Sequence, residues 1–447
     1  MTNPTIQKLK KHVDKIRIID THEHLPQEKD RVGRVVDALS ELFLHYASSD
    51  LISSGMKEEN LLTIRDTSKP LDERWSVLEP WWERIRNTGY ARVLDVAARD
   101  LYGVPGISSD TYRDLSDRMR ERNREGLYRW VLKDKAGIDI SILDELTSGY
   151  EIDRTFFAPI LRIGDIVTPN DRNELEILTK QHGARIHDFH DYVALIRKRF
   201  DEHEGKIFGI KIALAYRRPI FFEKRSYSEA EEAFNKLYKT RGFTRFTPDP
   251  KRRESRMVPW GPSAEELLPM QDYLIHIAIQ EAEKRRLPIQ IHTGLQEGNE
   301  NIISNSNPEL LVNLFMEYRD AKFDIFHGSW PYCSQLSALA KNFPNVYLDM
   351  SWMHIISPSK SRSALNEWLD EVPVNKILGF GGDFLCVEGA YGHAVIAREN
   401  ITRVLALKVE EGDLNFEDAK KYATWILRKN AEELFFPAHS QAKGAVD

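Results

Sequence analysis

The sequence predicts an α/β fold, a (β/α)8 TIM barrel, with a helical insertion after the first strand. Three observations indicate this fold. Short β-branched or apolar runs recur eight times, amphipathic stretches separate most of them, and side chains that bind metals or move protons follow several of the runs. Strands that alternate with helices form parallel sheets with right-handed crossovers. Eight such units are the number at which the sheet closes into a barrel.

The eight predicted strands are spread along the whole chain. We place them at about 16–22, 138–144, 155–162, 207–215, 288–292, 323–327, 345–350 and 376–382. Between them, residues 187–203 and 263–287 space their apolar side chains by three and four positions, as amphipathic helices do. Ser263 and Glu266 match a capping box at the start of the second of these helices. Two further helices follow the last strand.

Two intervals between strands are too long for a single crossover. Residues 27–135 follow the first strand and contain helix-like segments, so we expect a mostly helical insertion at the C-terminal rim of the barrel. The metal-dependent barrel itself would then comprise residues 1–26 and 136–447. A second insertion, at about 216–262, follows strand four. Its basic, proline-containing stretch at 251–256 is expected to be a solvated loop, or a loop that closes over an anionic substrate.

Composition indicates a soluble, enzyme-sized globular protein. Lys and Arg number 63 against 69 Asp and Glu, a net charge of −6, so nothing favours nucleic acid as a partner. Two cysteines, Cys333 and Cys386, cannot form a disulfide framework and fit a reducing compartment. The start of the chain lacks the apolar core of a signal peptide, and no apolar run approaches transmembrane length. We expect a cytoplasmic protein with a small-molecule substrate, no membrane partner, and self-association through aromatic helices of the insertion.

The first predicted strand, in IRIIDTHEHL, ends in two histidines one residue apart. Strand side chains alternate, so His22 and His24 point the same way, about 7 Å apart along an ideal strand. A twisted, open strand end would let both imidazoles converge on one ion. The alternative interpretation is a pair of exposed loop histidines.

Other residues of the same chemical kind end other strands. His292 ends strand five in LPIQIHTG, His327 ends strand six in FDIFHGSW, and Asp383 ends strand eight in KILGFGGDF. Singly, a structural histidine or a helix-capping aspartate explains each of them. In a barrel of this type, however, the active site lies at the C-terminal ends of the strands. Together with His22 and His24, these residues predict a metal site.

Strand four, in FGIKIALAY, carries Lys211 on a face otherwise made of small residues. Large apolar residues on the other face suit packing against helices, so Lys211 would point into the barrel. Burying an ammonium group is costly, and an interior lysine therefore needs a role. It could be carboxylated and ligate a metal, or meet a substrate carboxylate or enolate as a cation. The alternative is a lysine at the strand end whose amine reaches solvent.

With these residues in place, the sequence resembles the amidohydrolase superfamily. The match rests on the HxH motif after strand one, Lys211 on strand four, His292 on five, His327 on six and Asp383 on eight. The segments DTHEHL, FHGSWP, NVYLDMSW and LRKNAEELF are similar to the amidohydrolase-2 branch, which includes decarboxylases and domains fused to glutamine synthetase. The long insertion is similar to that of uronate isomerases. On strand eight, however, the segment GGDFLCVEG departs from the Asp-x-Arg pattern expected of uronate isomerases.

The resemblance implies that His22, His24 and Asp383 hold one divalent metal, with His292 as a fourth ligand or a substrate contact. Histidine and carboxylate ligands suit zinc, with manganese or iron as alternatives. A second metal would require a carboxylated Lys211.

The resemblance also implies hydrolysis by a metal-activated water. The size of the insertions, with Tyr216, Arg217, Arg218 and the basic 251–256 stretch, indicates a small, polar, anionic substrate. Asp383 would accept the proton of the water, and His327 would donate a hydrogen bond to the oxyanion. Lys211 and Arg217 would bind a negatively charged group of the substrate, although an ordinary surface position would also explain Arg217.

Tryptophans are predicted to wall the pocket: Trp330, Trp352 and the pair Trp81 and Trp82, although tryptophans commonly belong to a core. Non-hydrolytic alternatives remain open, because the barrel and the ligands are shared among reactions. They are a uronate-isomerase-like aldose–ketose isomerase and a metal-dependent decarboxylase. A third class is a metal-free barrel that serves as a binding module.

Overall fold

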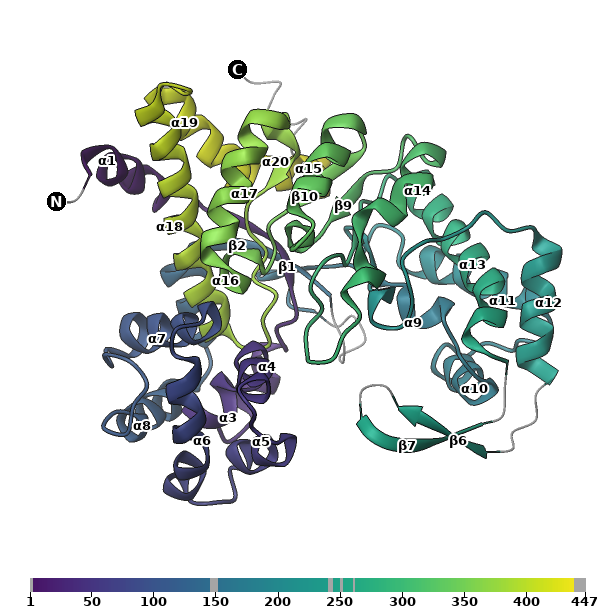
Figure 1. The fold of residues 1–447 in the computed structure, drawn as a ribbon, viewed down its shortest axis with the longest axis horizontal. Coiled ribbons are helices and arrows are strands. Elements are labelled where there is room, and N and C mark those ends of the chain that lie inside the picture. The colour runs from purple at the N-terminus through teal and green to yellow at the C-terminus, as the bar shows by residue number, and fades with distance from the viewer. Residues whose placement is uncertain (1–2, 145–151, 240–243, 250–251, 260–261, 438–447) are drawn as a thin grey trace.

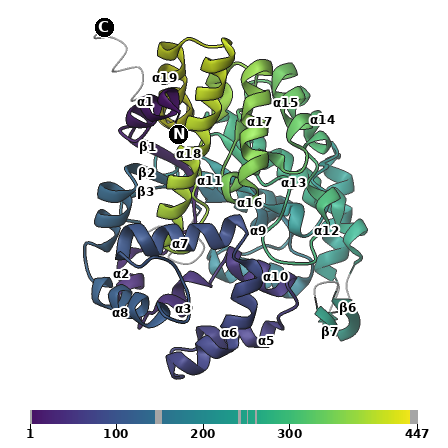
Figure 2. The same ribbon diagram turned by 60° about the vertical axis from the view of Figure 1, so that its left-hand side comes forward.

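The computed structural model describes residues 3–144, 152–239, 244–249, 252–259 and 262–437 (Figures 1 and 2). Parallel strands at eight positions form the centre of the molecule. The strands are β1 (Ile18–Glu23), β2 (Ile138–Leu143), β3 (Phe157–Pro159), β4 (Leu161–Arg162), β5 (Ile210–Ile212), β8 (Ile289–Ile291), β9 (Phe323–Ile325), β10 (Val346–Asp349) and β11 (Ile377–Leu378). The third position is shared by β3 and β4, which only Ile160 separates.

The strands close into a barrel. Their ladders run in the orders β1-β2-β3 and β11-β10-β9-β8-β5-β4, and every pairing among them is parallel. At the far edges, the Thr21 backbone N–H donates to the Phe380 carbonyl at 3.0 Å, which joins β1 to the segment after β11. The predicted (β/α)8 barrel is therefore confirmed, and each of the eight predicted strand regions contains an observed strand.

Helices follow the strands and cover the barrel (Figure 2). They are α9 (Gly164–Val167), α10 (Arg172–Gln181), α11 (Phe189–Glu202), α12 (Tyr227–Lys239), α13 (Ala264–Lys284), α14 (Val312–Glu317), α15 (Cys333–Asn342), α16 (Met353–Ile356), α17 (Pro358–Glu371), α18 (Val387–Glu411), α19 (Phe416–Thr424) and α20 (Asn430–Phe435), with α1 (Pro4–Val13) ahead of the first strand. Short 3-10 turns are η2 (Leu214–Tyr216), η3 (Ile303–Ser306), η4 (Pro308–Leu311), η5 (His327–Ser329) and η6 (Val374–Lys376), and η7 (Trp425–Lys429) is a π-helical turn. Ser263 and Glu266 form the expected capping box of α13.

The long interval between β1 and β2 is helical. It contains α2 (Glu28–Val32), α3 (Ala38–Leu42), α4 (Tyr46–Ser53), α5 (Glu58–Arg65), α6 (Leu71–Ile85), α7 (Gly89–Tyr102), α8 (Tyr112–Arg122) and the π-helical η1 (Arg129–Lys135). In Figure 1, α3 to α8 gather below the strands, while α20 lies on the opposite side.

Two contacts tie these helices to the barrel. A Cβ atom on Gly89 of α7 would lie 2.0 Å from the Ile355 carbonyl oxygen of α16, so the two helices touch through backbone atoms. The buried Arg31 guanidinium pairs with Glu41 at 3.1 Å and with Glu388 of α18 at 3.0 Å. The insertion is therefore fixed against the helices that flank β11.

The second insertion forms an antiparallel hairpin of β6 (Thr244–Asp249) and β7 (Arg252–Pro259), which projects from the body in Figure 1. The expected loop at 251–256 is therefore largely strand; residues 250 and 251 lie outside the described part. Among the described residues, no helix is both long enough and apolar enough to cross a membrane.

Candidate metal centre and active site

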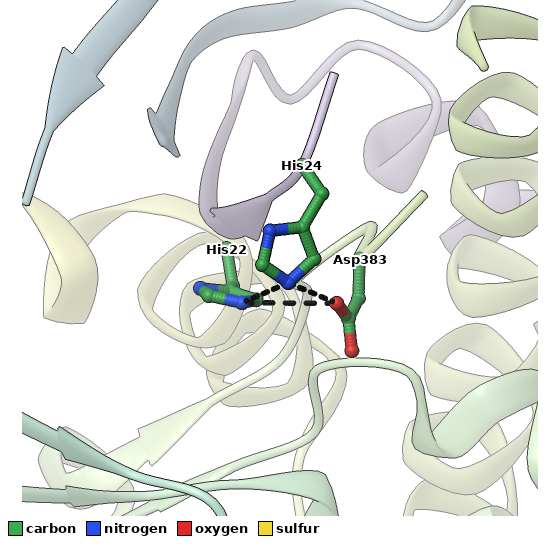
Figure 3. Close-up of side chains that lie close together, drawn as sticks. All are labelled: His22, His24 and Asp383. Atoms are coloured by element: carbon green, nitrogen blue, oxygen red, sulfur yellow. Dashed lines mark hydrogen bonds and ion pairs between the residues drawn. The ribbon is translucent and has the colours of Figure 1, made fainter. Parts of the chain in front are cut away.

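His22, His24 and Asp383 converge at the C-terminal ends of β1 and β11 (Figure 3). The Nε2 atoms of the two histidines are 3.2 Å apart. The Asp383 Oδ1 atom lies 3.7 Å from Nε2 of His22 and 3.4 Å from Nε2 of His24. The structure thus brings together the three residues that the sequence assigns to a metal.

The hydrogen bonds of the two histidines fix where their protons are. The Nδ1 atom of His22 lies 3.3 Å from Oε1 of Gln290, and Nδ1 of His24 lies 2.9 Å from the Asp144 carbonyl oxygen. Both partners can only accept a hydrogen bond, so Nδ1 carries the proton in each ring. When both rings are neutral, their two Nε2 lone pairs face each other, and a cation or a proton between them relieves the repulsion.

The same distances suit one coordination sphere. Ligand–metal bonds of about 2.0–2.2 Å place two ligand atoms of a tetrahedral site about 3.4 Å apart. The three observed separations run from 3.2 to 3.7 Å. Two neutral imidazoles and one carboxylate form a donor set that divalent metals accept, and it leaves coordination positions open for water or substrate.

The backbone before Asp383 is shaped to present its carboxylate. Asp383 has a φ of +59°, the left-handed region that side chains other than glycine rarely adopt. Its N–H donates to the His22 carbonyl at 2.8 Å, and its carbonyl accepts from the Tyr46 hydroxyl at 2.6 Å. A Cβ atom on the preceding Gly382 would lie 1.7 Å from Oε1 of Glu23. The GGD sequence is therefore required by close packing, and Tyr46 of the insertion holds the strained residue.

His292 and His327 form a pair beside this group. Nδ1 of His292 lies 3.0 Å from Nε2 of His327, and Nε2 of His292 lies 3.0 Å from the Leu295 carbonyl oxygen. Both nitrogens of His292 are thus engaged, and it lies outside the three-residue group. The geometry does not support the prediction of His292 as a fourth ligand. It supports the alternative of a substrate contact, because His292 lines the adjoining cavity.

His327 is fully buried and does not line that cavity. Its Nδ1 lies 2.9 Å from the Ser351 carbonyl oxygen and 3.9 Å from Oδ2 of Asp383. The predicted hydrogen bond from His327 to a substrate oxyanion is therefore not supported, because both ring nitrogens have other partners and His327 is not among the residues that line the cavity. What His327 does in this structure is orient His292.

Burial sets the charge of these groups. It lowers the pKa of His22 well below its usual value, and it lowers the pKa of His327 to about 4, so both rings are neutral near pH 7. Burial raises the pKa of Asp383, but its interactions with His24, His327 and Lys211 outweigh this and leave the pKa below its usual value. A neutral His22 ring beside an ionised Asp383 carboxylate is a protonation state that metal binding needs.

Lys211 of β5 points into the barrel, as the alternation along the strand predicts. It is only 2% exposed, so the alternative of a lysine reaching solvent is wrong. Its Nζ lies 3.5 Å from the centroid of the Phe326 ring and borders the cavity. Burial lowers the pKa of this amine to about 8, which leaves it mostly protonated near pH 7.

A cavity of about 450 Å³ opens beside the three-residue group. Three cationic side chains line it: Lys211, Arg162 and Arg217. Arg162 pairs with Asp144 at 2.6 Å, and Nη1 of Arg217 lies 3.3 Å from Oγ1 of Thr168. The position of Arg217 in the cavity wall agrees with its prediction as a substrate contact.

Aromatic side chains form part of the same wall. Trp352 lines the cavity and stacks on Tyr46, with ring centroids 4.5 Å apart. Trp330 does not line the cavity, because the chain after His327 turns away from it. The Trp330 carbonyl oxygen instead accepts from the Leu295 N–H at 2.7 Å. Trp82 is buried in the core of the insertion and Trp81 packs beside Arg84, so this pair does not line the cavity either.

Sequence reasoning missed several cavity residues. Arg162 directly ends the third barrel strand, and the strand-end rule used for His292 could have found it. His45 and Tyr46 come from the insertion, and Glu297 from the loop after β8. No local pattern marks these three, because only the packing of the insertion on the barrel places them there.

The closed parallel barrel, with a two-histidine, one-aspartate group at its C-terminal end, is the arrangement that the sequence motifs predict. Residues 227–436 match the amidohydrolase family model Amidohydro_2. The protein FluG of Emericella nidulans is 29% identical over 173 residues, which are 37% of this chain and 20% of that protein. The match thus spans only a fifth of the length of that curated relative.

Solved structures resemble the fold over nearly the whole chain. A uronate isomerase from Thermotoga maritima superposes with a TM-score of 0.79, 16% identity and 98% coverage of both chains. A glucuronate isomerase from Caulobacter crescentus superposes with a TM-score of 0.75 at 16% identity, covering 97% of this chain and 95% of that one. A proposed metal-dependent hydrolase from Lactobacillus casei gives 0.63 at 16% identity, with coverages of 96% and 98%. The resemblance to the amidohydrolase-2 branch and to the fold of uronate isomerases is confirmed.

Proposed function

We propose that this protein is a metal-dependent hydrolase of the amidohydrolase superfamily that acts on a small, polar, anionic molecule. One observation carries the proposal: the Nε2 atoms of two histidines lie 3.2 Å apart and face a carboxylate at the wall of a cavity lined by three cations. We also propose that the protein acts in the cytoplasm, without a nucleic-acid or membrane partner.

His22, His24 and Asp383 would hold one divalent metal, for which zinc is our first choice, with manganese or iron as alternatives. When bound, such a metal supplies Lewis-acid chemistry, polarising a carbonyl and lowering the pKa of water. The three residues leave coordination positions open on the side of the cavity.

Asp383 is the residue best placed to accept a proton. Its carboxylate is held ionised and lies at the border of the cavity. Hydrolysis requires a base that takes the proton of the attacking water and returns it to the leaving group. The left-handed backbone of Asp383, held by His22 and Tyr46, aims the carboxylate at that position.

The cations would bind and orient the substrate. Lys211, Arg162 and Arg217 line one cavity, so a carboxylate or phosphate in the substrate would meet several positive charges with little water between them. The stacked Trp352 and Tyr46 would pack against the less polar face of the molecule. This arrangement favours a compact anionic substrate over a large apolar one.

A second candidate is an aldose–ketose isomerase, which moves a proton between neighbouring carbon atoms. The His292–His327 pair favours it: two neutral rings carry two N–H groups, yet three contacts, to Leu295, to Ser351 and between the rings, need a proton. His292 borders the cavity, so a proton passed to it from a substrate would complete this set, whereas burial lowers the pKa of His292 well below its usual value and keeps the ring neutral otherwise. A decarboxylase remains a further alternative at the same site.

The test is a substrate panel with the metal-loaded protein. Anionic amides, esters and lactones are compared with sugar acids, and products are identified by mass spectrometry. Hydrolysis adds one water to the product formula, isomerisation leaves the formula unchanged, and decarboxylation removes CO₂. The proposal expects hydrolysis of an anionic member of the panel. Isomerisation of a sugar acid without any hydrolysis would replace the first candidate by the second.

A further inference from the structure

We propose that Gln290 is a positioning residue that fixes the His22 ring with its lone pair on Nε2, and that it thereby sets the metal affinity of the site. Gln290 lies on β8 and is fully buried. The part of this inference that concerns metal affinity rests on the proposed function. The part that concerns the protonation of His22 does not.

The orientation of the Gln290 amide is forced by its neighbours. One end of the amide lies 2.8 Å from the Thr21 carbonyl oxygen and 3.1 Å from Oδ2 of Asp324. A carbonyl oxygen only accepts, so this end must be the NH₂ group. The other end is then the oxygen, which lies 3.3 Å from Nδ1 of His22. Since this oxygen can only accept, Nδ1 of His22 must carry the proton, and Nε2 is free to bind a metal.

The sheet register explains why Gln290 reaches both partners. Gln290 is aligned with Lys211 on one neighbouring strand and with Asp324 on the other. The side chains of all three are buried. Thr21 and Asp324 both accept from the NH₂ end of the amide. A rotation would place the amide oxygen against the Thr21 carbonyl oxygen and leave the NH₂ group facing His22. The amide therefore has one favourable orientation.

His22 differs in this respect from His24, His292 and His327. Their N–H groups donate to backbone carbonyls, those of Asp144 for His24, Leu295 for His292 and Ser351 for His327. No substitution of a side chain removes a backbone carbonyl. Among these four histidines, only the N–H group of His22 donates to a side chain, so its protonation is the one that a substitution of its partner can change. Groups that orient a metal-binding histidine in this way typically contribute 10- to 100-fold to metal affinity.

Gln290→Met tests this directly, because methionine has a similar length and lacks the acceptor. The metal-free protein is titrated with zinc against a chromogenic chelator, and we expect affinity to fall by about 10- to 100-fold. Gln290→Glu is the conservative variant: a neutral glutamic acid can accept from His22 and donate to Thr21, so we expect it to recover most of the affinity. Gln271→Met is the matched control, since Gln271 of α13 is also buried but contacts Arg218 rather than a candidate ligand.

A second measurement does not require metal binding. Nitrogen-15 NMR of the metal-free protein with labelled histidine distinguishes the two neutral forms of His22, assigned with His22→Gln. We expect the proton on Nδ1 in the wild type and a mixture of forms in Gln290→Met. A proton on Nε2 of His22 in the wild type, or zinc affinity in Gln290→Met equal to that of Gln271→Met, would overturn the inference. A wild type that binds no divalent metal but keeps the Nδ1 proton would reject the proposed function and leave the role of Gln290 standing.

Discussion

At the scale of single residues, the chemistry of the site depends on which atom of each side chain carries a proton. The sequence identifies His22, His24 and Asp383 by their positions at strand ends, and the structure brings them together. The sequence could not reveal that His292 and His327 would contact each other. That contact depends on where the Leu295 and Ser351 carbonyl oxygens lie. Residue type and strand position are readable from the chain, whereas the direction of each N–H group is not.

Asp383→Asn should keep the fold and lose turnover. An amide cannot accept the proton that the ionised carboxylate accepts, and general-base catalysis typically contributes 10²- to 10⁴-fold to kcat. We expect kcat to fall by about this factor, measured on the substrate found in the panel, with an unchanged circular dichroism spectrum. Asp320→Asn, at an exposed position, is the control and should leave kcat unchanged. A kcat near the wild-type value in Asp383→Asn would remove Asp383 from the mechanism.

Binding of an anionic substrate should weaken above pH 8. The pKa of Lys211 is lowered to about 8 by burial, so its amine is charged below this pH and neutral above it. We therefore expect KM to be lower at pH 7 than at pH 9, as measured from initial rates at both values. Lys211→Met lacks the charge at every pH and should show a high KM with that pH dependence removed. A wild-type KM that does not change over this range would exclude Lys211 as a charged substrate contact.

At the scale of secondary-structure elements, the sequence predicted the barrel strands well and the connections less well. Alternating apolar runs located all eight strand positions, because each strand must face both the barrel interior and the surrounding helices. The strands are shorter than predicted. β11 covers only Ile377–Leu378, because the Gly379 N–H donates to the Ile426 carbonyl oxygen at 2.8 Å rather than to a neighbouring strand. The hairpin of β6 and β7 was missed because basic residues and prolines mask its strand pattern.

The contact between α7 and α16 gives a prediction at this scale. In Gly89→Ala, the added Cβ would lie 2.0 Å from the Ile355 carbonyl oxygen, and backbone atoms cannot move aside easily. We expect a loss of about 1–3 kcal/mol in the free energy of unfolding, as overpacking typically causes, measured by urea denaturation. Arg92→Ala, at an exposed position of the same helix, is the control and should change it by less than about 0.5 kcal/mol. Equal stabilities of the two variants would show that this close approach is not maintained in solution.

At the scale of the whole molecule, the site is assembled from both ends of the chain and from the insertion. β1 and the segment after β11 supply the three candidate ligands, and Tyr46 of the insertion holds Asp383 through a 2.6 Å hydrogen bond. The sequence predicts the ligands because barrel topology forces strand ends together. It does not predict which residues of the insertion line the cavity, because their placement depends on how separately folded helices pack on the rim.

Metal content of the purified protein tests the central claim most directly. After incubation with zinc, manganese or iron and removal of free ions, inductively coupled plasma mass spectrometry should find one divalent ion per chain in the wild type. The same measurement on His24→Ala, which keeps a folded barrel by circular dichroism, should find substantially less. A wild type that retains none of these metals, or a His24→Ala protein that retains the full amount, would contradict the account.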